Sequence, residues 1–245
     1  MSVLAYQLSG HRPVQLGIVV LQADETLEHD LRRLLPEETE LLVTRVPSAT
    51  SVSSQSLAAM EADLSAAARL LPRGARFAAL GFGCTSGTAQ IGVSQVAELL
   101  RAGADVATVT EPVSALIAAC QHLGIKRLAL VSPYVAEVSA QLVDVLEGAG
   151  IEISAFASFN EAQEANVVRI DASSIANAAR VTAVQAPCDG VFLSCTNLRT
   201  LDVIAGAEAE LGVPVLSSNL VLAWHMARLA GVAQSLRTGA ALVAR

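Results

Sequence analysis

Two cysteines stand in similar surroundings, in segments that are far apart along this chain. Cys84 lies in Gly-Phe-Gly-Cys-Thr-Ser-Gly (81–87) and Cys195 in Phe-Leu-Ser-Cys-Thr-Asn (192–197), 111 positions later (195 − 84). A thiolate can remove a proton from carbon or add to a double bond, and a thiol can return a proton. Two thiols in one cleft therefore suit an enzyme that works on both faces of a small carbon acid or alkene.

The same offset relates a second pair of segments. Residues 16–20 (Leu-Gly-Ile-Val-Val) correspond to residues 127–131 (Arg-Leu-Ala-Leu-Val) with the same shift of 111 positions (127 − 16). The chain therefore reads as two similar halves. Each half carries one of the two cysteines at the end of a predicted buried strand.

Apolar runs and amphipathic stretches alternate along the whole sequence. The runs predict strands at residues 16–21, 40–45, 77–83, 106–109, 127–131, 151–157, 190–194 and 213–216. The stretches predict helices at residues 26–35, 56–71, 91–101, 113–123, 135–149, 173–183, 198–211 and 220–229. Such alternation is typical of parallel sheets with right-handed crossovers.

Eight strand–helix units fit either one barrel or two separate sheets. The repeat favours the second: an α/β protein with two pseudo-symmetric, four-stranded, doubly wound (flavodoxin-like) domains that face a central cleft. We expect residues 1–114 together with 220–245 to form the N-terminal α/β domain, because the last helix is predicted to return to it. Residues 115–219 are expected to form the C-terminal α/β domain.

The composition of the chain argues against some classes of binding partner and cellular location. The chain has 245 residues, long enough for two domains, and a net charge of −7, which argues against a nucleic-acid partner. It has no apolar run of the ~18 residues that span a membrane, and residues 1–12 do not resemble a secretory leader. We therefore expect a cytoplasmic protein that is a homo-oligomer, as acidic enzymes of this size often are.

The remaining cysteines and the histidines predict no metal site. The four cysteines include no CxxC pair, and the four histidines are scattered along the chain. Cys120 falls within an amphipathic helical pattern and is expected to belong to the core, and Cys188 precedes a turn. Free thiols in a reducing compartment are expected.

Ligands of open parallel sheets bind at the carboxyl ends of the strands, where Cys84 and Cys195 are predicted to lie. Each is predicted to precede a helix, whose free N–H groups lower the pKa of a thiol. A lone cysteine is more often a core residue, but the duplicated setting favours a functional pair. The small residues that follow leave backbone amides free to hold a carboxylate: Thr85, Ser86, Thr196 and Asn197.

Two further polar residues follow predicted strands. Tyr134 could donate a hydrogen bond to a substrate carboxylate, or could simply pack at a helix start. Asp24 would repel a carboxylate, so helix capping or recognition of a cationic group fits it better.

The cysteine segments, Tyr134 and residues 211–225 resemble the aspartate/glutamate racemase superfamily, and within it the branch of maleate cis-trans isomerases and arylmalonate decarboxylases. The resemblance runs from about residue 14 to residue 231 and implies chemistry without a cofactor on a small carboxylate between two domains. Cys84 and Cys195 match the two thiols of the isomerases and racemases. The decarboxylases carry glycine at the position of Cys84, which argues against a dedicated decarboxylase.

The same resemblance implies roles for other residues. Tyr134 matches a tyrosine that binds the substrate carboxylate, and four residues fall where the family places carboxylate-holding groups: Thr85, Ser86, Thr196 and Asn197. Asn166 matches a substrate-binding asparagine of the maleate isomerases. Asp24 departs from the pattern, because maleate isomerases carry an asparagine at the end of the first strand. The segments 20–26 and 32–36 resemble the ectoine-utilization member of the family, and an amino group beside the substrate carboxylate would suit Asp24.

The expected function is cofactor-independent isomerisation or racemisation of a small carboxylate by two opposed cysteines. Two alternatives remain: an arylmalonate-type decarboxylase in which Cys195 donates the proton, and a carboxylate-binding protein without catalysis. The substrate is left open among maleate, an amino acid and an ectoine-derived diamino acid.

Overall fold

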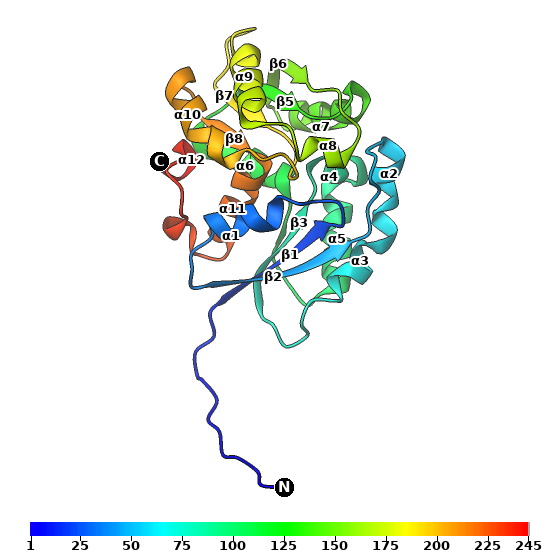
Figure 1. The fold of residues 1–245 in the computed structure, drawn as a ribbon, viewed down its shortest axis with the longest axis vertical. Coiled ribbons are helices and arrows are strands. Elements are labelled where there is room, and N and C mark those ends of the chain that lie inside the picture. Colours follow the sequence, from blue (N-terminus) through cyan, green and yellow to red (C-terminus); the bar gives the residue numbers. More distant parts are fainter. Residues whose placement is uncertain (245) are drawn as a thin grey trace.

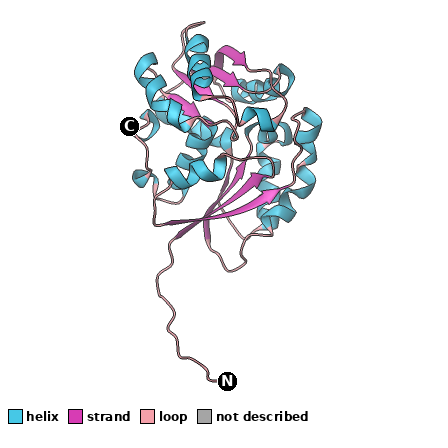
Figure 2. Ribbon diagram, viewed as in Figure 1, coloured by secondary structure: helices cyan, strands magenta, loops and turns pink. Residues whose placement is uncertain are grey.

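The computed structural model describes residues 1–244, which form two four-stranded parallel sheets with flanking helices (Figures 1 and 2). The first sheet contains β1 (Val14–Leu21), β2 (Thr39–Val46), β3 (Phe77–Gly83) and β4 (Val109–Thr110), in the order β2-β1-β3-β4. The second contains β5 (Arg127–Ser132), β6 (Glu152–Ser158), β7 (Gly190–Leu193) and β8 (Val215–Ser217), in the order β6-β5-β7-β8. The two orders are equivalent, so the predicted pseudo-symmetric α/β architecture is confirmed.

Helices connect and cover the strands. They are α1 (Leu27–Leu34), α2 (Ser54–Ala59), α3 (Glu61–Ala68), α4 (Thr85–Ile91), α5 (Val93–Gly103), α6 (Pro112–Leu123), α7 (Ala136–Gly148), α8 (Glu164–Val167), α9 (Ala172–Ala183), α10 (Leu201–Leu211), α11 (Ser218–Leu229), the 3₁₀ turn η1 (Ala233–Ser235) and α12 (Ala241–Ala244). Within residues 1–244, none of the helices has both the length and the apolar character needed to cross a membrane.

The central strands are apolar because helices cover both faces of each sheet. Ile18, Val19 and Val20 of β1 are fully buried although their side chains alternate between the two faces, and residues 128–131 of β5 repeat this pattern. The carboxyl ends of β1, β3, β5 and β7 consequently have rigid positions, and the loops that follow them carry the candidate site.

Local signals set several helix ends. The buried carboxylate of Glu111 accepts hydrogen bonds from the backbone N–H groups of Val113 and Ser114 and so caps α6, which has Pro112 at its first position. Gly124 ends α6 in the left-handed conformation, with a φ of 72°.

Several elements differ from the sequence-based expectation. The single helix predicted at residues 56–71 is two helices, α2 and α3, and η1 and α12 were not predicted. The unpredicted helix α4 starts directly after Cys84, and Gly92, with a φ of 99°, separates it from α5. The helix expected from residue 198 begins only at Leu201, because the preceding loop hydrogen-bonds to the other half of the molecule. The strand expected at residues 106–109 is the two-residue β4, and the short helix α8 was not expected.

The C-terminal part of the chain contacts both halves. Helix α11 packs against α6 and touches both β3 and β8 (Figure 1). Beyond it, the N–H of Arg237 donates to the carbonyl of Leu34 at 2.8 Å, and the N–H of Ala241 donates to Glu208 of α10 at 3.1 Å. The assignment of residues 220–245 to the N-terminal domain stays a prediction.

A buried polar pair joins α1 to α11. Asn219 Nδ2 donates to Asp30 Oδ2 at 2.7 Å and to the carbonyl of Thr196 at 2.9 Å. Burial raises the pKa of Asp30 from 3.8 to about 6, although the hydrogen bond from Asn219 lowers it. Because the pKa is higher in the folded than in the unfolded state, the folded state holds this proton more tightly. This contribution to stability is therefore full below about pH 4 and is lost as the pH rises through about 6.

We expect Asp30→Asn to abolish this loss of stability with rising pH. Between about pH 4 and about pH 8, the free energy of unfolding of the native protein should fall by about 3 kcal/mol relative to that of the variant. Urea unfolding across this range measures the difference, with Asp63→Asn on the exposed side of α3 as the control. Parallel pH dependences for the native protein and Asp30→Asn would contradict the expectation.

Candidate active site

A small cavity lies where the two halves meet, at the carboxyl ends of the central strands. Its lining residues are Leu21, Asp24, Cys84, Thr85 and Ser86 from the first half, and Tyr134, Glu164, Cys195, Thr196 and Asn197 from the second. The structure thus brings together every predicted site residue except Asn166. The cavity volume is about 10 Å³, roughly the room that one water needs.

Cys84 links the end of β3 to the start of α4. Its Sγ accepts a hydrogen bond from the N–H of Gly87 at 3.1 Å, and its side chain is buried. A Cβ at position 87 would lie 2.8 Å from this sulfur, so the glycine of the Cys-Thr-Ser-Gly segment makes the close approach possible.

Cys195 has an unusual backbone conformation at the end of β7. Its φ is 95°, in a region that non-glycine residues avoid and that costs about 1–3 kcal/mol. The Ser218 hydroxyl accepts from its N–H at 3.0 Å, and its Sγ accepts from the N–H of Asn197 at 3.3 Å. These contacts fix the position of the Cys195 thiol at the carboxyl end of β7, in the second sheet.

Both cavity thiols are harder to ionise than an ordinary cysteine. Burial raises the pKa of Cys84 to about 12, and burial together with the charge of Glu164 raises the pKa of Cys195 well above 9. The expectation of lowered thiol pKa values is therefore wrong for this structure. The loss of hydration outweighs the N–H groups, and no helix starts directly after Cys195.

A chain of short contacts leads from Cys195 to a carboxylate. Tyr134 OH donates to Glu164 Oε1 at 2.7 Å and lies 3.0 Å from Cys195 Sγ. Since the single phenolic proton goes to Glu164, the thiol is the donor to the phenol. Asn197 Nδ2 donates to Glu164 Oε2 at 2.7 Å, and burial raises the pKa of Glu164.

Glu164 is the site residue that sequence reasoning missed. It stands on the four-residue helix α8, whose position is fixed by contacts with the first half: Glu164 N–H donates to the carbonyl of Thr50 at 3.0 Å. Asn166 is exposed and donates to Glu161 Oε2 at 3.0 Å, outside the cavity. Nothing in the sequence distinguishes Glu164 from Glu161.

Several predicted carboxylate-binding groups are engaged in holding the halves together. Thr196 Oγ1 donates to the carbonyl of Gly83 at 3.1 Å, and Asn197 Oδ1 accepts from the N–H of Glu25 at 2.9 Å. The hydroxyls of Thr85 and Ser218 lie 2.7 Å apart. The remaining polar side chains at the cavity are then the two thiols, Ser86, Tyr134 and the two carboxylates of Asp24 and Glu164.

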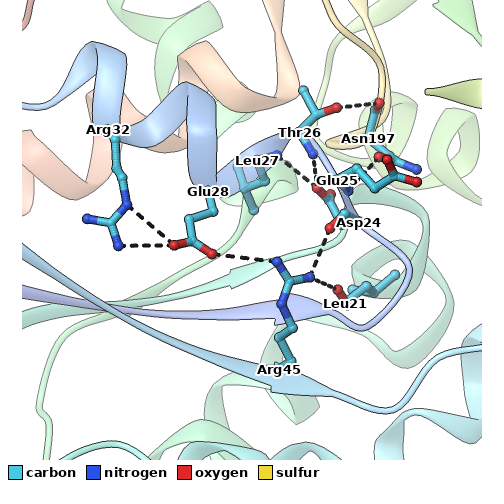
Figure 3. Close-up of polar contacts among 9 residues, drawn as sticks. All are labelled: Leu21, Asp24, Glu25, Thr26, Leu27, Glu28, Arg32, Arg45 and Asn197. Carbon is cyan, nitrogen blue, oxygen red and sulfur yellow. Dashed lines mark hydrogen bonds and ion pairs between the residues drawn. The ribbon is translucent and has the colours of Figure 1, made fainter. Parts of the chain in front are cut away.

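Asp24 follows β1 and fixes the start of α1. Its Oδ1 accepts from the N–H groups of Thr26 and Leu27, both at 2.8 Å (Figure 3). Burial raises its pKa, and these two hydrogen bonds lower it. Among residues 1–244, no group of three or more His, Cys, Asp or Glu is arranged to hold a metal ion.

Comparison with known proteins identifies a family and several relatives of this chain. The family model for arylmalonate decarboxylase matches residues 16–243. Arylmalonate decarboxylase of Bordetella bronchiseptica is 32% identical over 127 residues, which cover 51% of this chain and 53% of the relative. Maleate isomerase of Nocardia farcinica is 31% identical over 135 residues, covering 55% and 54%. These matches thus span about half the length of each relative.

A solved structure resembles almost the whole fold. The Nocardia farcinica maleate cis-trans isomerase, in a cysteine-to-serine mutant with a covalently bound succinylcysteine intermediate, has a TM-score of 0.83 and 26% identity, and the match covers 94% of this chain and 98% of that one. Together with a family model that spans nearly the entire sequence, this shows that the chain belongs to the arylmalonate decarboxylase family, in the superfamily of the aspartate/glutamate racemases.

Proposed function

We propose that this protein is a cofactor-independent isomerase of a small carboxylate, with Cys84 and Cys195 as its two catalytic groups. The observation that carries the proposal is that thiols from equivalent strand ends of the two halves line the same cavity. Binding alone needs no pair of thiols, whereas proton transfer at both faces of one carbon uses two acid–base groups, a role that two thiols can fill.

The related enzymes support a role for these thiols in covalent or acid–base chemistry. The maleate cis-trans isomerase of Nocardia farcinica forms a succinylcysteine intermediate, which is a cysteine added to the carbon skeleton of its substrate. The adduct in that structure is on a cysteine other than the one that the mutant replaces with serine. The same step is available here to the thiolate of either cavity cysteine: the sulfur adds to one alkene carbon, the new single bond rotates, and elimination restores the double bond and the thiolate.

The contacts of Glu164 suggest how a Cys195 thiolate forms. The Cys195 proton can pass to Tyr134 while the Tyr134 proton passes to Glu164, so that one proton leaves sulfur and one arrives at the carboxylate. Neutralising Glu164 removes a charge that raises the pKa of Cys195, so the transfer itself favours the thiolate.

Cys84 then serves as the proton donor. Its pKa of about 12 keeps it protonated at neutral pH. In the racemase form of the reaction, the Cys195 thiolate removes the α-proton and Cys84 delivers its own proton to the opposite face of the resulting carbanion. In the reverse direction the two thiols exchange roles.

A second candidate is decarboxylation with Cys195 as the proton donor. It is favoured by the family model and by the relative in Bordetella bronchiseptica. In this reaction the substrate loses CO₂, and Cys195 protonates the enediolate that remains. The cysteine at position 84 has no part in this chemistry, which makes it the weaker reading.

Proton NMR in D₂O, with the reduced and metal-free protein, tests these proposals. The substrates are maleate, L-aspartate, L-glutamate, N-acetylated diaminobutyrates and phenylmalonate. Fumarate formed from maleate, or loss of an α-proton signal from an amino acid, supports isomerisation. Phenylacetate formed from phenylmalonate as the only change would support decarboxylation, and binding without any reaction would support a carboxylate-binding protein.

A further inference from the structure

We propose that Ser218, which lies outside the cavity lining, is a positioning residue of this site. Its hydroxyl accepts a hydrogen bond from the backbone of Cys195 and donates its own proton to Thr85. The Thr85 proton is thereby left for a carboxylate oxygen of the ligand. The proposal rests on the proposed function only in taking the ligand to be a small carboxylate.

The first observation is the place of Ser218 between the two halves. It is the first residue of α11, directly after β8 of the second sheet, and it is fully buried. Its Oγ lies 3.0 Å from the backbone nitrogen of Cys195 and 2.7 Å from Oγ1 of Thr85, the residue after Cys84. One hydroxyl therefore joins the two cysteine segments, which come from opposite halves of the molecule.

The second observation is a count of protons. A serine hydroxyl has one proton to donate, and its oxygen can accept as well. The oxygen of Ser218 accepts from the N–H of Cys195, and among residues 1–244 the only acceptor within reach of its proton is Thr85 Oγ1. If Thr85 donated instead, the Ser218 proton would be buried without an acceptor, which costs free energy. Ser218 is therefore the donor of this pair.

This direction decides what Thr85 can do. Its hydroxyl accepts from Ser218, and its own proton has no acceptor among the described residues. Thr85 is buried and lines the cavity, so the group that can accept this proton is the ligand. A carboxylate oxygen is a strong acceptor for such a proton. Ser218 thus turns the Thr85 hydroxyl into a donor toward the cavity.

The third observation is the backbone of Cys195. Its φ of 95° persists only where the surrounding structure holds it, and the hydrogen bond to Ser218 is one of the contacts that do so. The same hydroxyl consequently fixes the thiol and the donor to the ligand relative to each other. Helix capping does not explain Ser218, because Ser217 is the residue that caps α11, by accepting from the N–H of Leu220 at 3.2 Å.

A double-mutant cycle on the full-length protein tests the proposal, with dissociation constants for maleate and for L-aspartate measured by calorimetry. Ser218→Ala and Thr85→Val are each expected to weaken binding by about tenfold. The double variant should bind no more weakly than Thr85→Val alone, because Ser218 acts on the ligand through Thr85. Ser218→Thr keeps a hydroxyl and should bind more tightly than Ser218→Ala.

Ser217→Ala is the matched control. Ser217 is also a fully buried serine at the start of α11, but it does not contact Thr85 or Cys195. Its variant should have a lower free energy of unfolding and the native affinity. A role of Ser218 in stability alone would give Ser218→Ala this same behaviour.

Neutron diffraction from the deuterated native protein tests the proton count without any substitution. We expect the deuterium of Ser218 to point to Thr85 Oγ1 and that of Thr85 to point into the cavity. Three results would overturn the proposal: a Thr85 deuterium directed at Ser218, losses of affinity that multiply to about a hundredfold in the double variant, or no binding of either compound by the native protein.

These outcomes are distinct from those of the proposed reaction. The expected pattern of affinities without any turnover would keep the role of Ser218 and remove the isomerase. Turnover with multiplying losses of affinity would do the reverse.

Discussion

Replacing Cys84 with alanine is expected to lower the rate of isomerisation or α-proton exchange by about 10³-fold, because one face of the substrate then lacks its proton donor or acceptor. Cys195→Ala should have an effect of at least the same size. Deuterium incorporation followed by NMR measures both, on whichever substrate the native protein turns over.

Cys120→Ala is the matched control for this loss. Cys120 is also a buried thiol, in α6, and burial raises its pKa to about 12 as it does for Cys84, but it does not line the cavity. Its variant should keep the native rate and fold. A Cys84→Ala protein that retains the native rate, beside an inactive Cys195→Ala protein, would contradict two-thiol catalysis and indicate the decarboxylase-type mechanism with one thiol.

The fold could be predicted for two reasons: each strand can be recognised from a short stretch of sequence, and the pattern of the first half repeats in the second. Strand β3 was predicted at its observed bounds, since Phe77–Gly83 is a short apolar run that ends at a polar segment. The 111-residue offset then predicted that the second sheet repeats the first, as the equivalent strand orders show. Once the strands are parallel, the position of Cys84 and Cys195 at the carboxyl edge of their own sheets follows from topology alone.

The electrostatics of the site could not be predicted in the same way. The sequence indicates that Cys84 follows a strand and precedes small residues, but not how completely the other half covers it. Burial is the largest cause of the raised pKa of both thiols, and it arises from contacts between halves, such as that of Thr196 with Gly83. The direction of the pKa shift of the two thiols therefore depends on contacts that form only when the two halves pack together.

Glu164 illustrates a second limit. It belongs to an acidic, weakly patterned segment between β6 and α9, and its place in the cavity depends on backbone contacts with residues 50–52 of the first half. Family resemblance indicated that this segment supplies a site residue but selected Asn166, which lies outside the cavity. A segment without strong periodicity can be aligned several ways, and only its contacts decide which side chain faces inward.

Glu164→Gln is expected to lower kcat by about 10²–10³-fold, because glutamine cannot accept the proton of Cys195 through Tyr134. Its single amide oxygen keeps only one of the two hydrogen bonds that Glu164 accepts from Tyr134 and Asn197. In the native protein Glu164 must be ionised to accept this proton. Since burial raises its pKa above 4.5, the rate should rise with pH through an acid limb that lies above that value. In the variant this limb should be absent, and the rate should increase only at alkaline pH, where Cys195 ionises directly.

A control in the same loop separates this role from a loss of structure or of substrate binding. Glu161→Gln changes an acid three positions earlier that holds Asn166 and lies outside the cavity, so its rate and acid limb should match those of the native protein. Tyr134→Phe removes the central link and should resemble Glu164→Gln in kcat and in pH profile. If Glu164→Gln raised KM while kcat and the acid limb stayed unchanged, Glu164 would contribute charge to the ligand site and take no part in proton transfer. The proton would then have to leave Cys195 by a route that bypasses Tyr134.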